Sequence, residues 1–243
     1  MIIKTIQVSP FQQNSRILID PTSNKVMIID PGDDISNILN LCDGRLITDI
    51  FITHSHIDHV GGLQTLLNKL SQTQDTSSIA LYAHSFGRIF RENINKQAAS
   101  YGLDTTLYLN APEPTIYLDN KTNLTFGSHT LDLLFTPGHA PGHVALFLNS
   151  SVPIPKQQKK NASPTTFDRY EDINFDGTFP ILLSGDALFK ESIGRTDLPL
   201  CNHSELIESI KTKLLVLPEN TLVLSGHGPN TTIGHELNFN PFL

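Results

Sequence analysis

The sequence predicts a layered α/β fold. Short apolar runs rich in β-branched residues alternate with amphipathic stretches, an order typical of β-sheets covered by α-helices. The chain has 243 residues and a hydrophobic share of 39%, which is enough for one sizeable domain with a buried core. We therefore expect a single domain over residues 1–243.

The individual elements follow from local patterns. The expected strands are the short apolar runs at 2–8, 15–19, 25–29, 49–53, 79–83, 131–136, 144–148, 181–184 and 222–225. The expected helices are the amphipathic stretches at 35–41, 62–70, 88–101 and 204–215. Ser204 is the expected N-cap of the last helix, because its side chain can accept a hydrogen bond from a backbone N–H in the first turn.

Residues 149–180 form a long polar connection, and we expect it to be a mobile insertion. The strand before it leads away from His139, and the strand after it returns toward Asp186. The tip of the insertion should therefore lie far from both residues.

The composition excludes several classes of function. A net charge of −7 argues against a general nucleic-acid binder, because phosphate contacts require a clustered positive surface. The two cysteines, Cys42 and Cys201, have neither the spacing of a zinc ribbon nor that of a disulfide framework. Neither a signal peptide nor a membrane-spanning stretch is visible, so we expect a cytoplasmic protein that does not bind a membrane.

The densest group of metal-binding side chains directly follows the apolar run 50–52. Residues two apart in an extended chain project to the same side, so His54 and His56 can converge on one ion. Asp58 and His59 would then turn toward another ion. Nitrogen and carboxylate donors without thiolate suit zinc, manganese or iron and leave room for a reactive water.

Further candidate ligands follow other apolar strands. His139 lies in a turn shaped by proline and glycine after strand 131–136, Asp186 follows strand 181–184, and His227 follows strand 222–225. Donors grouped at strand ends are what an α/β scaffold uses to build a site.

Together these motifs resemble the metallo-β-lactamase superfamily, and within it the type II glyoxalases (hydroxyacylglutathione hydrolases). The resemblance covers nearly the whole chain and is strongest with the short, single-domain bacterial branch. Besides the histidine motif, it includes the segments 8–14, 29–32, 185–189, 192–199 and 231–243. It implies an αββα sandwich with the metals at one edge.

The resemblance also implies a set of ligands for two divalent ions, with zinc expected first and iron or manganese as alternatives. The first ion would be bound by His54, His56 and His139, and the second by Asp58, His59 and His227, with Asp186 bridging both. Asp30 and His143 would support the ligands by hydrogen bonds. The remaining histidines match no ligand position and are expected on the surface or in the core: His84, His129, His203 and His235.

Such a site predicts hydrolysis of a small-molecule thioester such as S-lactoylglutathione. Two ions about 3.5–4 Å apart can share one water and lower its pKa toward about 7, which supplies hydroxide at neutral pH. Asp58 would be the catalytic residue that orients this nucleophile. A thiolate leaves without a strong acid because thiols ionise near pH 8.5.

Substrate recognition has two interpretations at Arg195. It occupies the position at which longer type II glyoxalases place a basic residue against the glutathione carboxylate, or it forms a structural ion pair with Asp197. The longer enzymes also carry a helical C-terminal extension that contacts glutathione. The sequence printed above ends at Leu243, soon after His227, so we expect its selectivity for glutathione thioesters to differ.

Two other functions compete with the hydrolase. Persulfide dioxygenases share the fold and a similar segment at 194–197, and they bind a single iron, here by His54, His139 and Asp186. A regulatory protein with a metal site that performs no catalysis is the second alternative.

Overall fold

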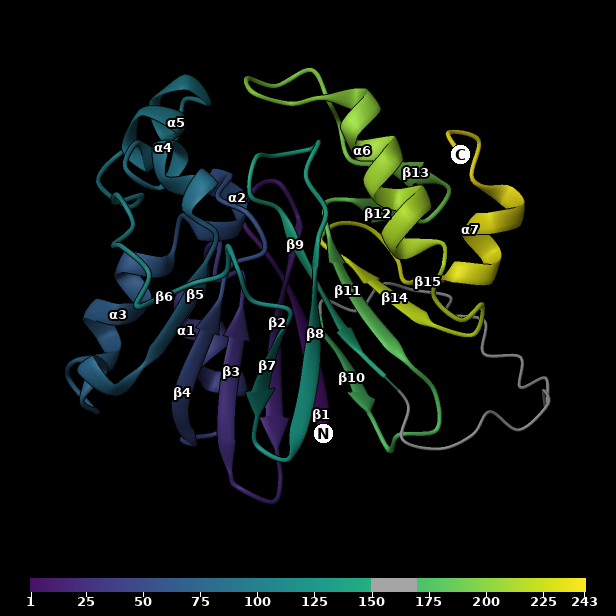
Figure 1. Cartoon of the computed structure of the whole chain (residues 1–243). Coiled ribbons are helices and arrows are strands. Elements are labelled where there is room, and N and C mark those ends of the chain that lie inside the picture. The colour runs from purple at the N-terminus through teal and green to yellow at the C-terminus, as the bar shows by residue number, and fades with distance from the viewer. Residues whose placement is uncertain (150–169) are drawn as a thin grey trace.

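Two β-sheets pack face to face and carry helices on their outer sides (Figure 1). The structure is a computed structural model that describes residues 1–149 and 170–243. This arrangement is the predicted αββα sandwich. None of the helices in these two ranges has the length and apolar character that crossing a lipid bilayer requires.

The first sheet has seven strands, antiparallel on one side and parallel on the other. Their order is β10 (Tyr170–Asn174), β1 (Ile2–Val8), β2 (Gln13–Asp20), β3 (Lys25–Ile29), β4 (Leu46–Phe51), β5 (Ala80–Ala83) and β6 (Ile116–Tyr117). Strands β3 to β6 are parallel because the connections between them cross over the outer face of the sheet. The helices of these connections are α1 (Ile35–Leu41), α2 (Ile57–Val60), α3 (Leu63–Leu70), α4 (Arg88–Arg91) and α5 (Ile94–Ser100).

The second sheet has six strands and carries the C-terminal helices. Their order is β15 (Thr231–Thr232), β14 (Leu222–Ser225), β11 (Ile181–Gly185), β9 (Val144–Leu148), β8 (His129–Phe135) and β7 (Asn123–Phe126). The small hairpin β12 (Leu188–Phe189) and β13 (Ser192–Ile193) lies beside it. The outer helices are α6 (His203–Ser209), which continues as a π-type segment at Ile210–Leu214, and α7 (Ile233–Phe239).

Three apolar clusters hold these layers together. The central one lies between the sheets and joins inward-facing residues such as Leu18 and Phe51 to Leu146 and Leu183. The other two lie between each sheet and its outer helices. The core therefore fixes the two sheets relative to each other, and with them the strand ends at the edge between α2 and the β12–β13 hairpin.

Most predicted elements are found, with two corrections. The helix predicted at 88–101 is two helices, because the amide of Asn93 donates to the carbonyl of Ile89 and replaces the regular helix at that point. The N-cap predicted at Ser204 is wrong, because the side chain of Asn202 accepts the hydrogen bond from the N–H of Glu205. Of the insertion expected at 149–180, residues 150–169 lie outside the described ranges, and 170–174 form β10 against β1.

Shortening Leu146 to alanine is expected to lower the free energy of unfolding by about 2–5 kcal/mol. Leu146 is fully buried between the sheets, so truncation leaves a cavity in the central cluster. The matched control is Leu46→Ala, at a strand leucine whose surface is 54% exposed, with an expected loss below about 0.5 kcal/mol. Urea unfolding checks both; equal losses would contradict the assigned core.

Candidate metal centre

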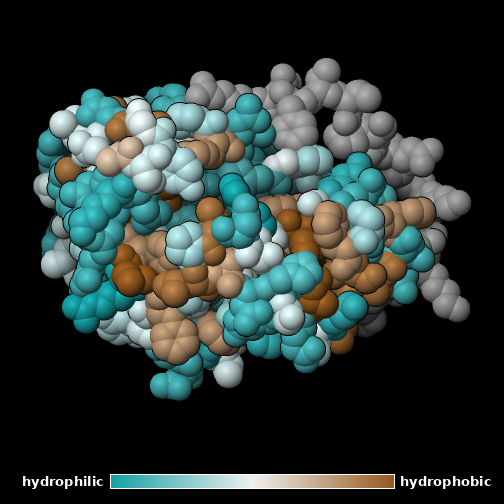
Figure 2. Space-filling view, turned by 90° about the horizontal axis from the view of Figure 1, so that it is seen from above, coloured by the Kyte–Doolittle hydropathy of each residue, from teal (hydrophilic) through white to brown (hydrophobic). Residues whose placement is uncertain are grey.

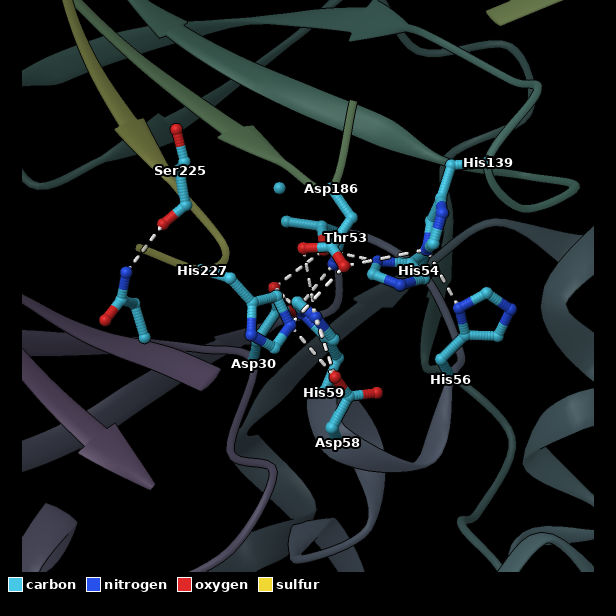
Figure 3. Close-up of polar contacts among 12 residues, drawn as sticks. Asp30, Thr53, His54, His56, Asp58, His59, His139, Asp186, Ser225 and His227 are labelled. Atoms are coloured by element: carbon cyan, nitrogen blue, oxygen red, sulfur yellow. Dashed lines mark hydrogen bonds and ion pairs between the residues drawn. The ribbon is translucent and has the colours of Figure 1, made fainter. Parts of the chain in front are cut away.

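The structure brings the seven predicted donor side chains together in two adjacent groups (Figure 3). Within each group the potential ligand atoms all lie within 4.8 Å of one another. The first group is His54, His56 and His139, and the second is Asp58, His59, Asp186 and His227.

Asp186 lies between the two groups. One of its carboxylate oxygens is 3.2 Å from Nε2 of His59, and the other is 3.6 Å from Nε2 of His139 and 3.5 Å from Nε2 of His227. A single carboxylate therefore faces histidines of both groups.

The local backbone explains how one short segment serves both groups. The chain leaves β4 in an extended conformation as far as His56 (φ −69°, ψ 153°), and helix α2 then begins at Ile57. His54 and His56 therefore project to the same side, as the alternation predicts, whereas Asp58 and His59 occupy the first turn of a helix. In Figure 3 this segment meets the donors of the second sheet from the opposite side.

The other donors follow the ends of strands in the second sheet. Asp186 comes directly after β11, and His227 comes two residues after the end of the parallel neighbour β14, so their backbones are adjacent. The N–H of Gly226 donates to the carbonyl of Gly185 at 2.8 Å, which fixes the two strand ends together. His139 lies in the turn between β8 and β9.

Hydrogen bonds on the outer side of the site orient the histidines. Nδ1 of His139 donates to the carbonyl of Arg195 at 2.9 Å, and Nδ1 of His227 donates to the carbonyl of Phe11 at 3.1 Å. Nδ1 of His59 donates to the carboxylate of Asp30 at 2.9 Å. Because Nδ1 of each of these rings donates a hydrogen bond outward, the Nε2 atom of the same ring faces the centre of the site. Metal-ligating histidines need this arrangement.

The buried atoms that face the centre fit metal ions. Nε2 of His54, Nε2 of His59 and Oδ1 of Asp186 are buried without a hydrogen-bond partner of good geometry. Nδ1 of His56 lies 3.0 Å from Nε2 of His139, so two ring nitrogens converge on one point. Buried polar atoms are normally paired, and a cation is a partner that fits this set of nitrogen and carboxylate donors.

The two groups differ in their electrostatics. Burial, together with the neighbouring His139, lowers the pKa of His56 to about 3, and burial also holds the pKa of His54 well below its usual range. In the second group burial alone would lower the pKa of His59, but Asp186 and Asp58 outweigh it and raise that pKa well above its usual value. His54 and His56 are therefore neutral, whereas the carboxylates of the second group favour positive charge on His59 and His227.

Asp30 and His143 each form a hydrogen bond with one of the predicted metal ligands, Asp30 with His59 and His143 with Asp186. The carboxylate of Asp30 accepts from the N–H and the hydroxyl of Thr53, at 2.8 and 2.6 Å, as well as from His59. Nε2 of His143 accepts from the N–H of Asp186 at 3.0 Å, so its proton is on Nδ1 and is donated to the hydroxyl of Thr136. Burial lowers the pKa of His143 to about 3, which keeps the ring neutral.

Arg195 forms an ion pair with Asp197, which is one of the two roles that the sequence left open for it. Its guanidinium binds the carboxylate of Asp197 through two hydrogen bonds of 2.7 Å, and both side chains are exposed. The same arginine lines the cleft over the donors. The other histidines lie in neither group: His84, His129, His203 and His235.

A cleft of about 350 Å³ opens over the donors, and much of its wall was not predicted. Beyond the metal-binding side chains, its lining includes Phe11, Gln97, Tyr101, Phe189, Ser192 and Arg195. Of these, Phe11, Phe189, Ser192 and Arg195 lie in segments that carry the family resemblance, but Gln97 and Tyr101 do not. No motif in the sequence marks the end of α5 as part of the site.

Replacing Gly226 with alanine is expected to weaken metal binding and lower activity by about a hundredfold or more. A Cβ at this position would lie 2.0 Å from Oδ1 of Asp186 and 2.9 Å from Cε1 of His59, so the carboxylate must move. The control is Gly228→Ala, where a Cβ meets nothing within 4 Å and the positive φ costs about 1 kcal/mol. Metal affinity measured against a chromophoric chelator checks both variants, and unchanged affinity in the Gly226 variant would contradict the assigned geometry.

Comparison with known proteins agrees with this fold. The family model described as "Metallo-beta-lactamase superfamily" matches residues 8–151, more than half of the chain. A Bacillus subtilis protein named "Probable metallo-hydrolase YqgX" is 31% identical, over 99% of this chain and 96% of its own length. The hydroxyacylglutathione hydrolase GloC of Haemophilus influenzae is 29% identical, over 100% of this chain and 98% of its own.

Two solved structures are similar over almost their entire length. The BLEG-1 B3 metallo-β-lactamase superposes with a TM-score of 0.77 at 32% identity, covering 99% of both chains. TTHA1623, crystallised in a di-iron-bound form, gives a TM-score of 0.72 at 30% identity, covering 98% of this chain and 99% of its own. The two donor groups fit a dinuclear metal site of this kind. The chain therefore belongs to the metallo-β-lactamase superfamily.

Proposed function

We propose that this protein is a binuclear metal-dependent hydrolase that cleaves a thioester, with S-lactoylglutathione as the first candidate substrate. The observation that carries the proposal is the pair of adjacent donor groups that share Asp186 beneath an open cleft. The similarity to the Haemophilus influenzae hydroxyacylglutathione hydrolase GloC supports the choice of substrate. The free thiols of Cys42 and Cys201 support a cytoplasmic location.

In this proposal His54, His56 and His139 would hold one ion, Asp58, His59 and His227 would hold the other, and Asp186 lies between the two groups. Zinc is the first candidate, and iron and manganese suit the same donors. When bound, such ions lower the pKa of a shared water to about 7 and act as Lewis acids toward a carbonyl oxygen. Asp30 and His143 maintain the orientation of His59 and Asp186.

Asp58 is the proposed catalytic residue. Its Oδ2 lies 3.0 Å from Nε2 of His227, and its side chain lines the cleft. Burial alone would raise the pKa of Asp58, but His59 and His227 outweigh it and keep the group ionised. The anionic carboxylate can then accept a hydrogen bond from the attacking water and orient it. Water adds to the carbonyl carbon, the C–S bond breaks, and the thiol leaves.

Metal analysis coupled to turnover of S-lactoylglutathione tests this function. Two ions per chain with thioester cleavage are the expected result. One iron per chain, with oxygen uptake on glutathione persulfide and no thioester cleavage, would replace the proposal by a dioxygenase. Metal-loaded protein that cleaves no thioester, β-lactam or phosphoester would instead be a metal-binding protein without hydrolase activity.

A further inference from the structure

Two aromatic rings form one wall of the cleft, from segments outside the metal-binding motifs. Phe11 lies in the turn between β1 and β2, and Tyr101 directly follows helix α5. Their ring centroids are 5.1 Å apart with the planes at 74°, an edge-to-face contact. Tyr101 is 47% exposed and Phe11 is partly buried, so the pair keeps apolar surface open toward the cleft.

Both rings are held in fixed positions relative to the donors. The carbonyl of Phe11 accepts the hydrogen bond from Nδ1 of His227. Helix α5 is tied to the metal-binding segment by Gln97, whose Oε1 accepts from the N–H of Ile57 at 3.2 Å. The amide nitrogen of Gln97 donates to the carbonyl of Phe90, whose ring in turn contacts His56. The aromatic wall is therefore a preformed part of the site.

Part of the polar lining of the cleft is already hydrogen-bonded within the protein. The amide of Gln97 accepts from the N–H of Ile57 and donates to the carbonyl of Phe90, and the guanidinium of Arg195 uses two of its five N–H groups to bind Asp197. Among the described lining residues outside the donor groups, the hydroxyls of Ser192 and Tyr101 form no hydrogen bond to another group of the described chain. The lining also includes the apolar side chains Phe189, Ile193 and Leu198. Figure 2, which looks down on this end of the molecule, shows hydrophobic patches on both sides of its middle.

The aromatic wall suits an apolar substituent on the thioester better than a charged one. A charged or amide group of a substrate that lies against this wall loses hydration without gaining a compensating hydrogen bond. An apolar arm instead gains binding energy in proportion to the area that it covers. Aromatic and aliphatic groups can both pack against the Phe11–Tyr101 pair.

We propose that the cleft selects thioesters that carry an apolar arm, and that Phe11 and Tyr101 are the specificity-determining residues that bind it. The inference rests on the proposed thioesterase function. In this inference catalysis and specificity reside in different residues. The metal-binding groups act on the thioester bond of every substrate, and the Phe11–Tyr101 wall determines which substrates bind best.

A matched set of thioesters tests the inference on the metal-loaded enzyme. Phenylacetyl and acetyl thioesters of N-acetylcysteamine differ only in the acyl arm, and benzyl thioacetate moves the ring to the thiol side. We expect kcat/KM for one of the two aromatic thioesters to exceed that for the acetyl compound by about tenfold or more, a ratio that corresponds to about 1.4 kcal/mol. Most of the gain should appear in KM, because binding the arm is the same before and during the reaction.

Variants of Tyr101 test whether this residue determines the preference for aromatic thioesters. Tyr101→Ala should reduce the aromatic preference at least about fivefold, and Tyr101→Phe should keep it. Leu107→Ala is the control, at a neighbouring side chain that is 64% exposed and does not line the cleft. The amide isostere of the phenylacetyl substrate should inhibit competitively, and its inhibition constant should rise in the Tyr101→Ala variant alone.

The outcomes separate the two proposals. Efficient cleavage of S-lactoylglutathione, with no preference for either aromatic thioester over the acetyl compound, would overturn the inference and leave the thioesterase function standing. An aromatic preference that survives Tyr101→Ala unchanged would also overturn it. If the metal-loaded enzyme cleaves none of these thioesters, both proposals are wrong.

Discussion

Replacing Asp58 with asparagine is expected to lower kcat/KM for the thioester about a thousandfold, which equals about 4 kcal/mol of transition-state stabilisation. Asparagine keeps the size and shape of the side chain but removes the charge. The change therefore removes an anionic ligand of the proposed second ion and the acceptor that orients the water, while the packing around helix α2 stays the same.

The electrostatics of the site explain why the loss should be large. His59 and His227 both have pKa values raised by neighbouring carboxylates, with Asp186 the strongest contributor and Asp58 also contributing. Without the charge of Asp58, the second donor group retains a single carboxylate for a divalent ion. We expect the variant to keep the ion of the first group and to bind the second more weakly.

The experiment needs a fold control and a metal readout. Asp33→Asn is the matched variant, because Asp33 is a nearby carboxylate that belongs to neither donor group and binds the hydroxyl of Tyr108. Its activity should stay within about threefold of the parent. Circular dichroism and metal content are measured for both variants. Near-normal turnover by folded Asp58→Asn protein would contradict the two-metal mechanism.

The sequence predicts strands well where the residues of a strand are themselves distinctive. The predicted bounds 2–8, 25–29, 144–148 and 222–225 agree with β1, β3, β9 and β14, because each is a run of β-branched or other apolar residues between polar turns. The elements that were not predicted are the strands β6, β7, β10, β12, β13 and β15 and the helices α2 and α7. Four of these strands, β6, β12, β13 and β15, have only two residues each, so their identity depends on a pairing partner elsewhere in the chain rather than on their own composition.

In the candidate site, too, some residues could be predicted from the sequence and others could not. The donors could be predicted because each follows a strand and has a side chain with distinctive chemistry, as Asp186 after β11 does. The wall of the cleft could not, because the contact between Phe11 and Tyr101 joins segments far apart in sequence, and neither residue is unusual in its local context. Arg195 shows the limit of motif reasoning: two geometries were open, and the ion pair with Asp197 is the one formed in the structure.

Removing the metal with a chelator is expected to lower the melting temperature by about 15 °C or more. An ion that binds only the folded chain, at a concentration of about 1,000 times its dissociation constant, stabilises it by about 4 kcal/mol. Two such ions contribute about 8 kcal/mol, and each kcal/mol shifts Tm by about 2–4 °C for a domain of this size. Differential scanning calorimetry before and after chelation, with re-addition of zinc, measures the shift.

The donor geometry gives the physical reason for this dependence on metal. Without a cation, the carboxylates of Asp58 and Asp186 lie among the histidines of the site, and the buried Nε2 atoms of His54 and His59 lack a hydrogen-bond partner of good geometry. Protonation of His59 and His227 then offsets the negative charge of the two carboxylates. The control is the double variant His54→Ala, Asp186→Asn, which lacks a donor of the first group and the shared carboxylate. Its melting temperature should respond little to the chelator. A parent protein that melts within about 2 °C with and without metal would show that the cluster is stabilised by its own hydrogen bonds, and that no resident ion completes it.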